Sequence, residues 1–160
     1  TIRAGLAGFA PSPHRGALLE IAGVRFLDDC YNANPVSMTA AAAALLALPG
    51  GGRALAVLGR MAELGPESEA LHVETGARLA ALGLDLVVAV GEGSAALAAG
   101  CRAAGGAALH LATHAEAARW LAGHAAPGDR VLLKGSRSAG MEEVLACYRR
   151  LVAGGGGEGA

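Results

Sequence analysis

The chain has 160 residues, of which 53% are hydrophobic and only 3% aromatic, and its formal net charge is −1. This length suits one domain that buries about two thirds of its unfolded surface, and the near-neutral charge without a basic patch argues against a nucleic-acid-binding surface. Because every hydrophobic stretch is shorter than ~18 residues and no charged-then-hydrophobic leader opens the chain, we expect a cytoplasmic protein without a membrane segment.

The first segment of the chain predicts a linker. Residues 1–16 carry Pro11, Pro13 and three glycines, a composition that does not form a regular element. The sequence begins at Thr1 rather than at a methionine, so we expect a piece of a longer protein. Two β-prone runs, 18–21 and 24–27, flank Ala22-Gly23 and predict a tight hairpin.

After this hairpin, predicted helices and strands alternate. We expect helices at 35–48, 68–82, 94–101, 115–121 and 141–151, and strands at 54–58, 86–90, 107–111 and 130–133. Such alternation predicts an α/β fold, a Rossmann-like three-layer sandwich whose mostly parallel sheet follows an N-terminal β-hairpin. The domain is expected over residues 17–151. Residues 152–160 contain four consecutive glycines and are expected to form a disordered tail.

The polar residues of the chain concentrate where predicted strands end. Residues 28–35, Asp-Asp-Cys-Tyr-Asn-Ala-Asn-Pro, follow the second strand of the hairpin and precede a helix. Carboxylates and amides at this edge of a parallel sheet can hold hydroxyls, a metal-bound water or phosphate. The alternative is that they only form an Asx-turn and cap the helix.

A second polar loop follows the last predicted strand. Residues 134–138, Lys-Gly-Ser-Arg-Ser, place two cations and two hydroxyls in five positions. A carboxylate is a natural partner, because arginine can bind it with two hydrogen bonds and a helix N-terminus adds donors. The alternative is a capped helix with solvated charges.

Other candidate sites are weak. Gly91-x-Gly93 resembles part of a dinucleotide fingerprint, but the next strand does not end in an acid, so we interpret it as a close strand-to-helix turn. His72 is expected to support the loop at 59–65. No nucleophile elbow, no metal-ligand spacing of cysteines or histidines and no P-loop occurs, so we expect no metal site and no catalytic residue in this domain alone.

Three segments in the same order, 28–38, 57–65 and 134–138, resemble the C-terminal domain of the Mur ligases of bacterial cell-wall synthesis. The similarity is greatest to the branch that adds D-alanyl-D-alanine, and it covers about residues 3–150. One residue departs from the pattern: the family usually has an acid where this chain has Arg60. The role of Arg60 is therefore open.

The resemblance implies part of an ATP-dependent ligase that forms an amide bond between D-alanyl-D-alanine and UDP-N-acetylmuramoyl-tripeptide in peptidoglycan synthesis. In this family a central domain holds the P-loop and most contacts to Mg²⁺, and an N-terminal domain holds the UDP sugar. The C-terminal domain closes over ATP and the dipeptide. We therefore expect residues 1–16 to lead from the chain's own central domain, the enzyme to be a monomer, and this domain alone to be inactive.

The resemblance also assigns site residues. The residues expected to bind ATP are Arg15, Asp29 and Asn32. Asp29 matches the family's acid that holds the ribose hydroxyls, and Asn32 matches the polar residue nearest the phosphates. Those expected to bind D-alanyl-D-alanine are Asn34, Lys134, Ser136 and Arg137. The sequence leaves one other function open, a free-standing, non-catalytic module that binds a nucleotide or cofactor.

Overall fold

A six-stranded sheet forms the centre of the computed structural model, which describes residues 14–155. Its strands are β1 (Ala17–Ile21), β2 (Val24–Asp29), β3 (Ala54–Leu58), β4 (Leu86–Val90), β5 (Ala108–Leu111) and β6 (Arg130–Lys134). They lie in the order β1-β2-β6-β3-β4-β5, with β1 antiparallel to β2 and every other pair parallel. The predicted hairpin and mostly parallel sheet are confirmed.

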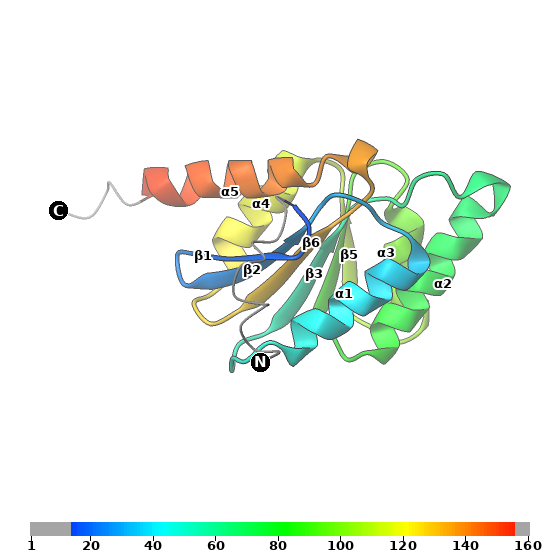
Figure 1. The fold of residues 1–160 in the computed structure, drawn as a ribbon, viewed down its shortest axis with the longest axis horizontal. Coiled ribbons are helices and arrows are strands. Elements are labelled where there is room, and N and C mark those ends of the chain that lie inside the picture. Colours follow the sequence, from blue (N-terminus) through cyan, green and yellow to red (C-terminus); the bar gives the residue numbers. More distant parts are fainter. Residues whose placement is uncertain (1–13, 156–160) are drawn as a thin grey trace, which may run out of the picture.

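Helices cover both faces of this sheet (Figure 1). One face carries α1 (Pro35–Ala47), α2 (Ser68–Ala81) and α3 (Ala95–Ala103), and the other carries α4 (His114–His124) and α5 (Glu142–Gly154). The predicted three-layer sandwich is therefore confirmed. Because α1 and α5 leave from neighbouring strands toward opposite faces, the topology predicts a ligand-binding crevice beyond the carboxyl ends of β2 and β6.

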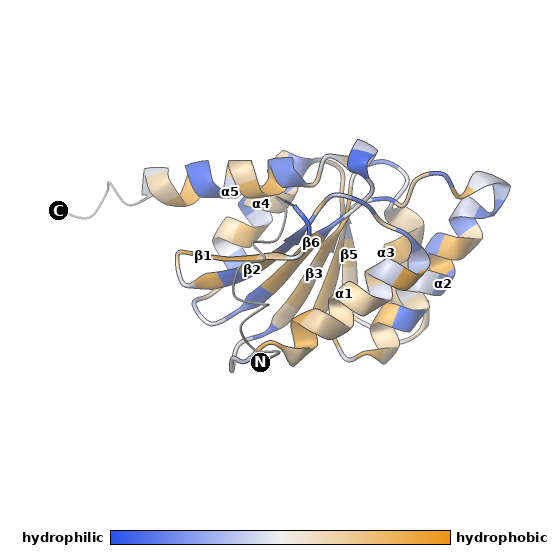
Figure 2. Cartoon of the chain, in the orientation of Figure 1, coloured by the Kyte–Doolittle hydropathy of each residue, from blue (hydrophilic) through white to orange (hydrophobic). Residues whose placement is uncertain are grey.

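The strand β3 contributes side chains to both hydrophobic cores, one on each face of the sheet. All five of its residues are buried, and Figure 2 shows its hydrophobic colouring between the helical layers. Successive side chains of a strand point to opposite faces. Leu55 and Val57 pack in the core under α4 and α5, whereas Ala54, Ala56 and Leu58 pack in the core under α1, α2 and α3.

Glycines let α2 and α3 approach each other closely. A Cβ atom on Gly76 would lie 2.1 Å from the carbonyl oxygen of Leu97, and one on Gly100 would lie 2.0 Å from that of Val73. Side chains larger than hydrogen are excluded at both positions. The backbones of α2 and α3 therefore pack directly against each other at these two positions.

At the amino edge of the sheet, Asp129 holds two loops together. One carboxylate oxygen accepts the backbone N–H of Arg53 at 2.9 Å, and the other accepts the N–H of Ala126 at 2.9 Å and the Arg53 guanidinium at 2.7 Å. Burial alone would raise the pKa of Asp129, but these hydrogen bonds outweigh it and hold the pKa below its usual value. Arg130 beside it donates to the carbonyls of Leu48 and Gly52.

Several predicted element boundaries were wrong by one to three residues. The last helix runs to Gly154 rather than 151, because Val152 packs against the core under α4 and α5, so residues 152–154 of the predicted tail are helical. Two 3₁₀ helices, η1 (Gly65–Glu67) and η2 (Arg137–Ala139), were not predicted, since three residues carry no periodicity. Residues 1–13 of the predicted linker and 156–160 of the predicted tail lie outside the described residues.

Candidate functional site

The strands β2, β6 and β3 end level with one another. Asp29, Lys134 and Leu58 are partners in the sheet register, so each is at the carboxyl end of its strand. Asp29 and Lys134 were expected to follow their strands but are the last residues within them. Their side chains leave the sheet on the same face, because paired residues of adjacent strands point the same way.

We name the first cavity at this edge the Asp29 pocket. It has a volume of about 380 Å³ and is lined by Arg15, Gly16, Asp29, Tyr31, Asn32, Asn34, Ser37 and Lys134. The Lys134 side chain is only 3% exposed, and its ammonium donates to the Asp29 carboxylate at 2.6 Å and to the carbonyl of Asn32 at 2.8 Å. Asp29 is 27% exposed and keeps an oxygen for a ligand.

The residues before β1 are tied to the rim of this pocket. The backbone N–H of Tyr31 donates to the carbonyl of His14 at 3.0 Å, and the His14 ring lies 2.8 Å from the Asp28 carboxylate. The Arg15 guanidinium stacks on the Tyr31 ring, 3.7 Å from its centroid. Nearby, burial and the charge of Asp28 raise the pKa of Cys30, which keeps this thiol uncharged.

Asn34 has the capping role that one interpretation of the sequence proposed. Its side-chain oxygen accepts the N–H of Ser37 at 2.8 Å, and the Ser37 hydroxyl accepts the N–H of Asn34 at 3.0 Å, a capping box at the start of α1. Pro35 occupies the first turn, where its missing N–H has no cost. The Asn32 side-chain oxygen accepts the N–H of Ala33, and Asn32 also lines the pocket.

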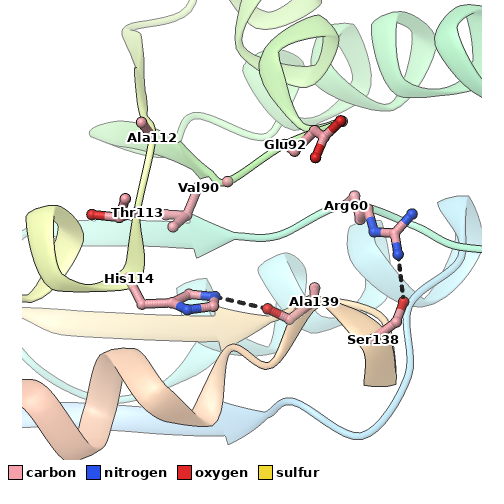
Figure 3. Close-up of a pocket in the computed structure, with 10 residues that line it drawn as sticks. Arg60, Val90, Glu92, Ala112, Thr113, His114, Ser138 and Ala139 are labelled. Carbon is pink, nitrogen blue, oxygen red and sulfur yellow. Dashed lines mark hydrogen bonds between the residues drawn. The ribbon is translucent and has the colours of Figure 1, made fainter.

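We name the second cavity the Arg60 pocket. It has a volume of about 550 Å³ and lies where β3, β4, β5 and β6 end (Figure 3). Its lining residues are Arg60, Val90, Gly91, Glu92, Gly93, Ala112, Thr113, His114, Ser138 and Ala139. In Figure 3, Arg60 and Glu92 lie toward one end of the cavity and Thr113 and His114 toward the other. The Arg60 guanidinium donates to the Ser138 hydroxyl at 2.9 Å.

Histidines fix two walls of the Arg60 pocket. His72 is buried in α2; its Nε2 accepts the N–H of Met61 at 2.9 Å, and its Nδ1 donates to the Ser68 carbonyl at 2.7 Å. Because one nitrogen accepts while the other donates, this ring is neutral. The predicted support of the 59–65 loop by His72 is confirmed. His114 donates from Nε2 to the Ala139 carbonyl at 2.7 Å and so joins α4 to η2.

Two glycines let η2 lie close over the ends of β3 and β6. A Cβ atom on Gly59 would come within 2.8 Å of both Ala139 and Met141, and one on Gly135 would come within 2.7 Å of Met141. The N–H of Ser136 donates to the Arg60 carbonyl at 2.9 Å. The loop after β6 is therefore held against the loop after β3, and Ser138 is brought to Arg60.

The structure separates the residues expected to bind the dipeptide. Lys134 and Asn34 line the Asp29 pocket together with the residues expected to bind ATP. Ser136 is buried beside Ser138, with 3.3 Å between their hydroxyls. The Arg137 side chain is 68% exposed, lies 3.7 Å from Glu142 and lines neither cavity. Neither serine caps α5, which begins after Met141 without a side-chain cap.

Within residues 14–155, no three histidine, cysteine, aspartate or glutamate side chains gather in a way that could hold a metal ion. No helix of the described part is long and hydrophobic enough to cross a membrane.

Comparison with known proteins decides the family. The family model described as "Mur ligase, glutamate ligase domain" matches residues 14–137. This chain belongs to the Mur ligase family. The match includes both pockets up to Arg137 and leaves only Ser138 and Ala139 of the lining residues beyond it.

The Mur ligase domain resembles individual relatives over most of its length. It is 42% identical over 147 residues to the UDP-N-acetylmuramoyl-tripeptide–D-alanyl-D-alanine ligase of Escherichia coli, which covers 90% of this chain and 31% of that protein. The Bacillus subtilis ligase of the same name is 32% identical, and the match covers 88% of this chain and 32% of that protein. The chain thus spans about a third of the length of these relatives.

Solved structures give the same result. The MurF ligase of Thermotoga maritima, in complex with ADP, superposes with a TM-score of 0.79 at 30% identity and covers 93% of this chain and 33% of that one. A MurF structure from Acinetobacter baumannii superposes with a TM-score of 0.82 at 35% identity, and the match covers 92% of this chain and 33% of that one. The recognition of the family from its sequence motifs is confirmed.

Most residues of the Arg60 pocket of this Mur ligase domain were not assigned to a site from the sequence. Arg60, Glu92, Thr113 and His114 come from three loops, and no single loop contains a recognisable cluster. The available signal was topological, because all three loops follow parallel strands and therefore meet at one edge. Gly91 and Gly93 both adopt left-handed conformations, in agreement with a close turn.

Proposed function

We propose that this chain is the C-terminal domain of an ATP-dependent ligase that joins D-alanyl-D-alanine to UDP-N-acetylmuramoyl-tripeptide. The observation that carries the proposal is the 42% identity, over 90% of the chain, to the Escherichia coli ligase with that name. The partners of this domain are then its own central and N-terminal domains and the two substrates. The full-length enzyme would act as a monomer in peptidoglycan synthesis.

The Asp29 pocket would take the nucleotide. Asp29 offers carboxylate oxygen to ribose hydroxyls, and Lys134 keeps that carboxylate in place from beneath. Arg15 and Asn32 stand at the same cavity as a cation and an amide that suit phosphate. ATP, when bound, supplies the phosphoryl group that activates the tripeptide carboxylate. The described residues offer no cluster that fits Mg²⁺, so this domain is assigned no role in holding it.

The Arg60 pocket would take the dipeptide. It lies on the neighbouring strand ends and contains both a cation and an anion, Arg60 and Glu92, as suits a zwitterion. Ser136 and Ser138 belong to the loop that follows Lys134, so one loop borders both pockets. Closure of this domain over the central domain would exclude water from the reacting groups.

Two measurements test the proposal. In the full-length protein, release of ADP should require UDP-N-acetylmuramoyl-tripeptide and D-alanyl-D-alanine together; release that is independent of the dipeptide, or that needs a different amino acid, would overturn it. Because the 160 residues contain no P-loop, the isolated chain should bind ATP with a dissociation constant weaker than about 10 μM, roughly −7 kcal/mol, in isothermal titration. Tighter binding would favour the free-standing nucleotide-binding module.

A further inference from the structure

Residues 14–16 lie against the carboxyl end of β2, immediately before β1 begins. His14 and Gly16 both have left-handed backbone conformations, with φ of 64° and 70°. Glycine adopts this region freely, whereas a residue with a Cβ atom enters it rarely and at a cost. Contacts made by His14 therefore hold the segment on its path, and they decide where the next residue, Arg15, lies.

The Asp28 carboxylate gives His14 its position. The Asp28 side chain is only 5% exposed, and one of its oxygens lies 2.8 Å from the His14 Nδ1. The other oxygen has no hydrogen-bond partner among residues 14–155, and the nearby Cys30 thiol donates to the Leu133 carbonyl. A buried carboxylate without a partner is costly, so Asp28 favours the conformation in which the His14 ring is docked on it.

Adjacent residues of this segment reach opposite faces of the sheet. Successive side chains of β2 alternate between the two faces. Phe26 packs in the core under α4 and α5, which places Asp28 on that face, whereas Asp29 lines its pocket on the other. His14 contacts Asp28, and Arg15 lines the Asp29 pocket. Fixing His14 on one face therefore fixes the backbone from which Arg15 extends on the other.

We propose that His14 is a positioning residue for nucleotide binding, because its ring, docked on Asp28, places the Arg15 guanidinium at the Asp29 pocket. His14 itself lines neither pocket. The Tyr31 N–H donates to the His14 carbonyl at 3.0 Å, and the Tyr31 ring supports the Arg15 guanidinium at 3.7 Å. The guanidinium keeps N–H donors for a phosphate group. This inference rests on the proposed nucleotide site and adds a residue that acts on the site without touching the ligand.

The test is His14→Gly in the full-length enzyme. Glycine removes the ring and accepts the left-handed backbone, so the variant loses the contact to Asp28 without added strain. We expect the KM for ATP to rise about tenfold, as when a charge-assisted hydrogen bond is lost, and the KM for D-alanyl-D-alanine to stay unchanged. His14→Asn should restore most of the affinity for ATP, because asparagine tolerates the left-handed region and its amide can donate to Asp28.

A double variant separates positioning from a merely structural role. If His14 acts through Arg15, then His14→Gly should add little to the KM for ATP once Arg15→Ala is in place. The double variant should therefore have the KM of Arg15→Ala alone, and additive increases would show that the inference is wrong. The control is His124→Ala, which removes an exposed ring that lines neither pocket and should behave as wild type.

Failure of this inference differs from failure of the proposed nucleotide site. If Arg15→Ala and Asp29→Ala raise the KM for ATP but His14→Gly does not, the site stands and His14 does not position it. If none of the three variants changes the KM for ATP, the nucleotide binds elsewhere, and the proposed use of the Asp29 pocket fails together with the inference.

Discussion

Charged residues lie at both the amino ends and the carboxyl ends of the parallel strands, but their hydrogen-bonding partners differ between the two edges. At the amino edge, the Asp129 carboxylate accepts two backbone N–H groups and the Arg53 guanidinium. At the carboxyl edge, Asp29 is held by one lysine, and Arg60 by one hydroxyl. A charge whose hydrogen-bonding capacity is filled by fixed backbone groups stabilises the fold, whereas a charge that keeps free capacity beside a cavity can bind a ligand.

This difference explains why similar residues have separate roles. Arg130 and Lys134 are the first and last residues of β6. Arg130 donates to carbonyls of the segment after α1 and fixes the amino edge, while Lys134 reaches a carboxylate that faces a pocket. The amino edge should therefore respond to mutation through stability and the carboxyl edge through substrate binding.

The largest effect is expected at the amino edge. Asp129→Ala removes the acceptor of four hydrogen bonds and leaves Arg53 without its carboxylate partner, so the free energy of unfolding should fall by about 3 kcal/mol. This value is at the low end for a buried pair because the Arg53 side chain is 45% exposed. Urea denaturation of the isolated chain measures it. The control Glu74→Ala, which breaks an exposed pair within α2, should cost less than about 0.5 kcal/mol.

At the carboxyl edge, substitutions of Asp29 and Lys134 should weaken nucleotide binding, and a double-mutant cycle measures how strongly the two residues depend on each other. Asp29→Ala and Lys134→Ala should each raise the KM for ATP about tenfold in the full-length enzyme, because Lys134 holds the carboxylate in position. The double variant should cost less than the sum of both, with a coupling of about 1 kcal/mol. An increase in the KM for the dipeptide alone after Lys134→Ala would instead support the assignment made from the sequence.

A smaller effect should follow Gly59→Ala. The added methyl group would meet Ala139 and Met141 at 2.8 Å and displace η2, which carries Ser138 away from Arg60. We expect a rise of about threefold in the KM for the dipeptide and a loss of about 1 kcal/mol in stability. Gly51→Ala is the matched control, because an added Cβ there meets no atom within 4 Å. Equal kinetics for the two variants would show that η2 does not position the pocket.

The sequence predicted the layers of this fold well because strand and helix periodicities are local properties. The run Ala54–Leu58 is continuous and hydrophobic, and it became β3 with those bounds. The Asp29 pocket was also predictable, since most of its residues come from one segment, 29–37. The partner of Lys134 and the pocket around Arg60 were not, because both depend on β6 lying between β2 and β3, an order that no local pattern encodes.

The smallest predicted effect is the pH dependence of the stability that Asp129 contributes. Hydrogen bonds from Arg53 and Ala126 hold the pKa of Asp129 below its usual value despite burial, so the carboxylate binds a proton less readily in the folded chain than in the unfolded one. Its contribution to stability is therefore present above the unfolded pKa, about 3.9, and is lost as pH falls through the folded pKa. Urea midpoints between pH 7 and pH 3 should show the gap between wild type and Asp129→Asn narrowing only at the acidic end. A gap that stays constant over this range would mean that Asp129 stabilises the loops by its shape and hydrogen bonds and that its charge contributes nothing.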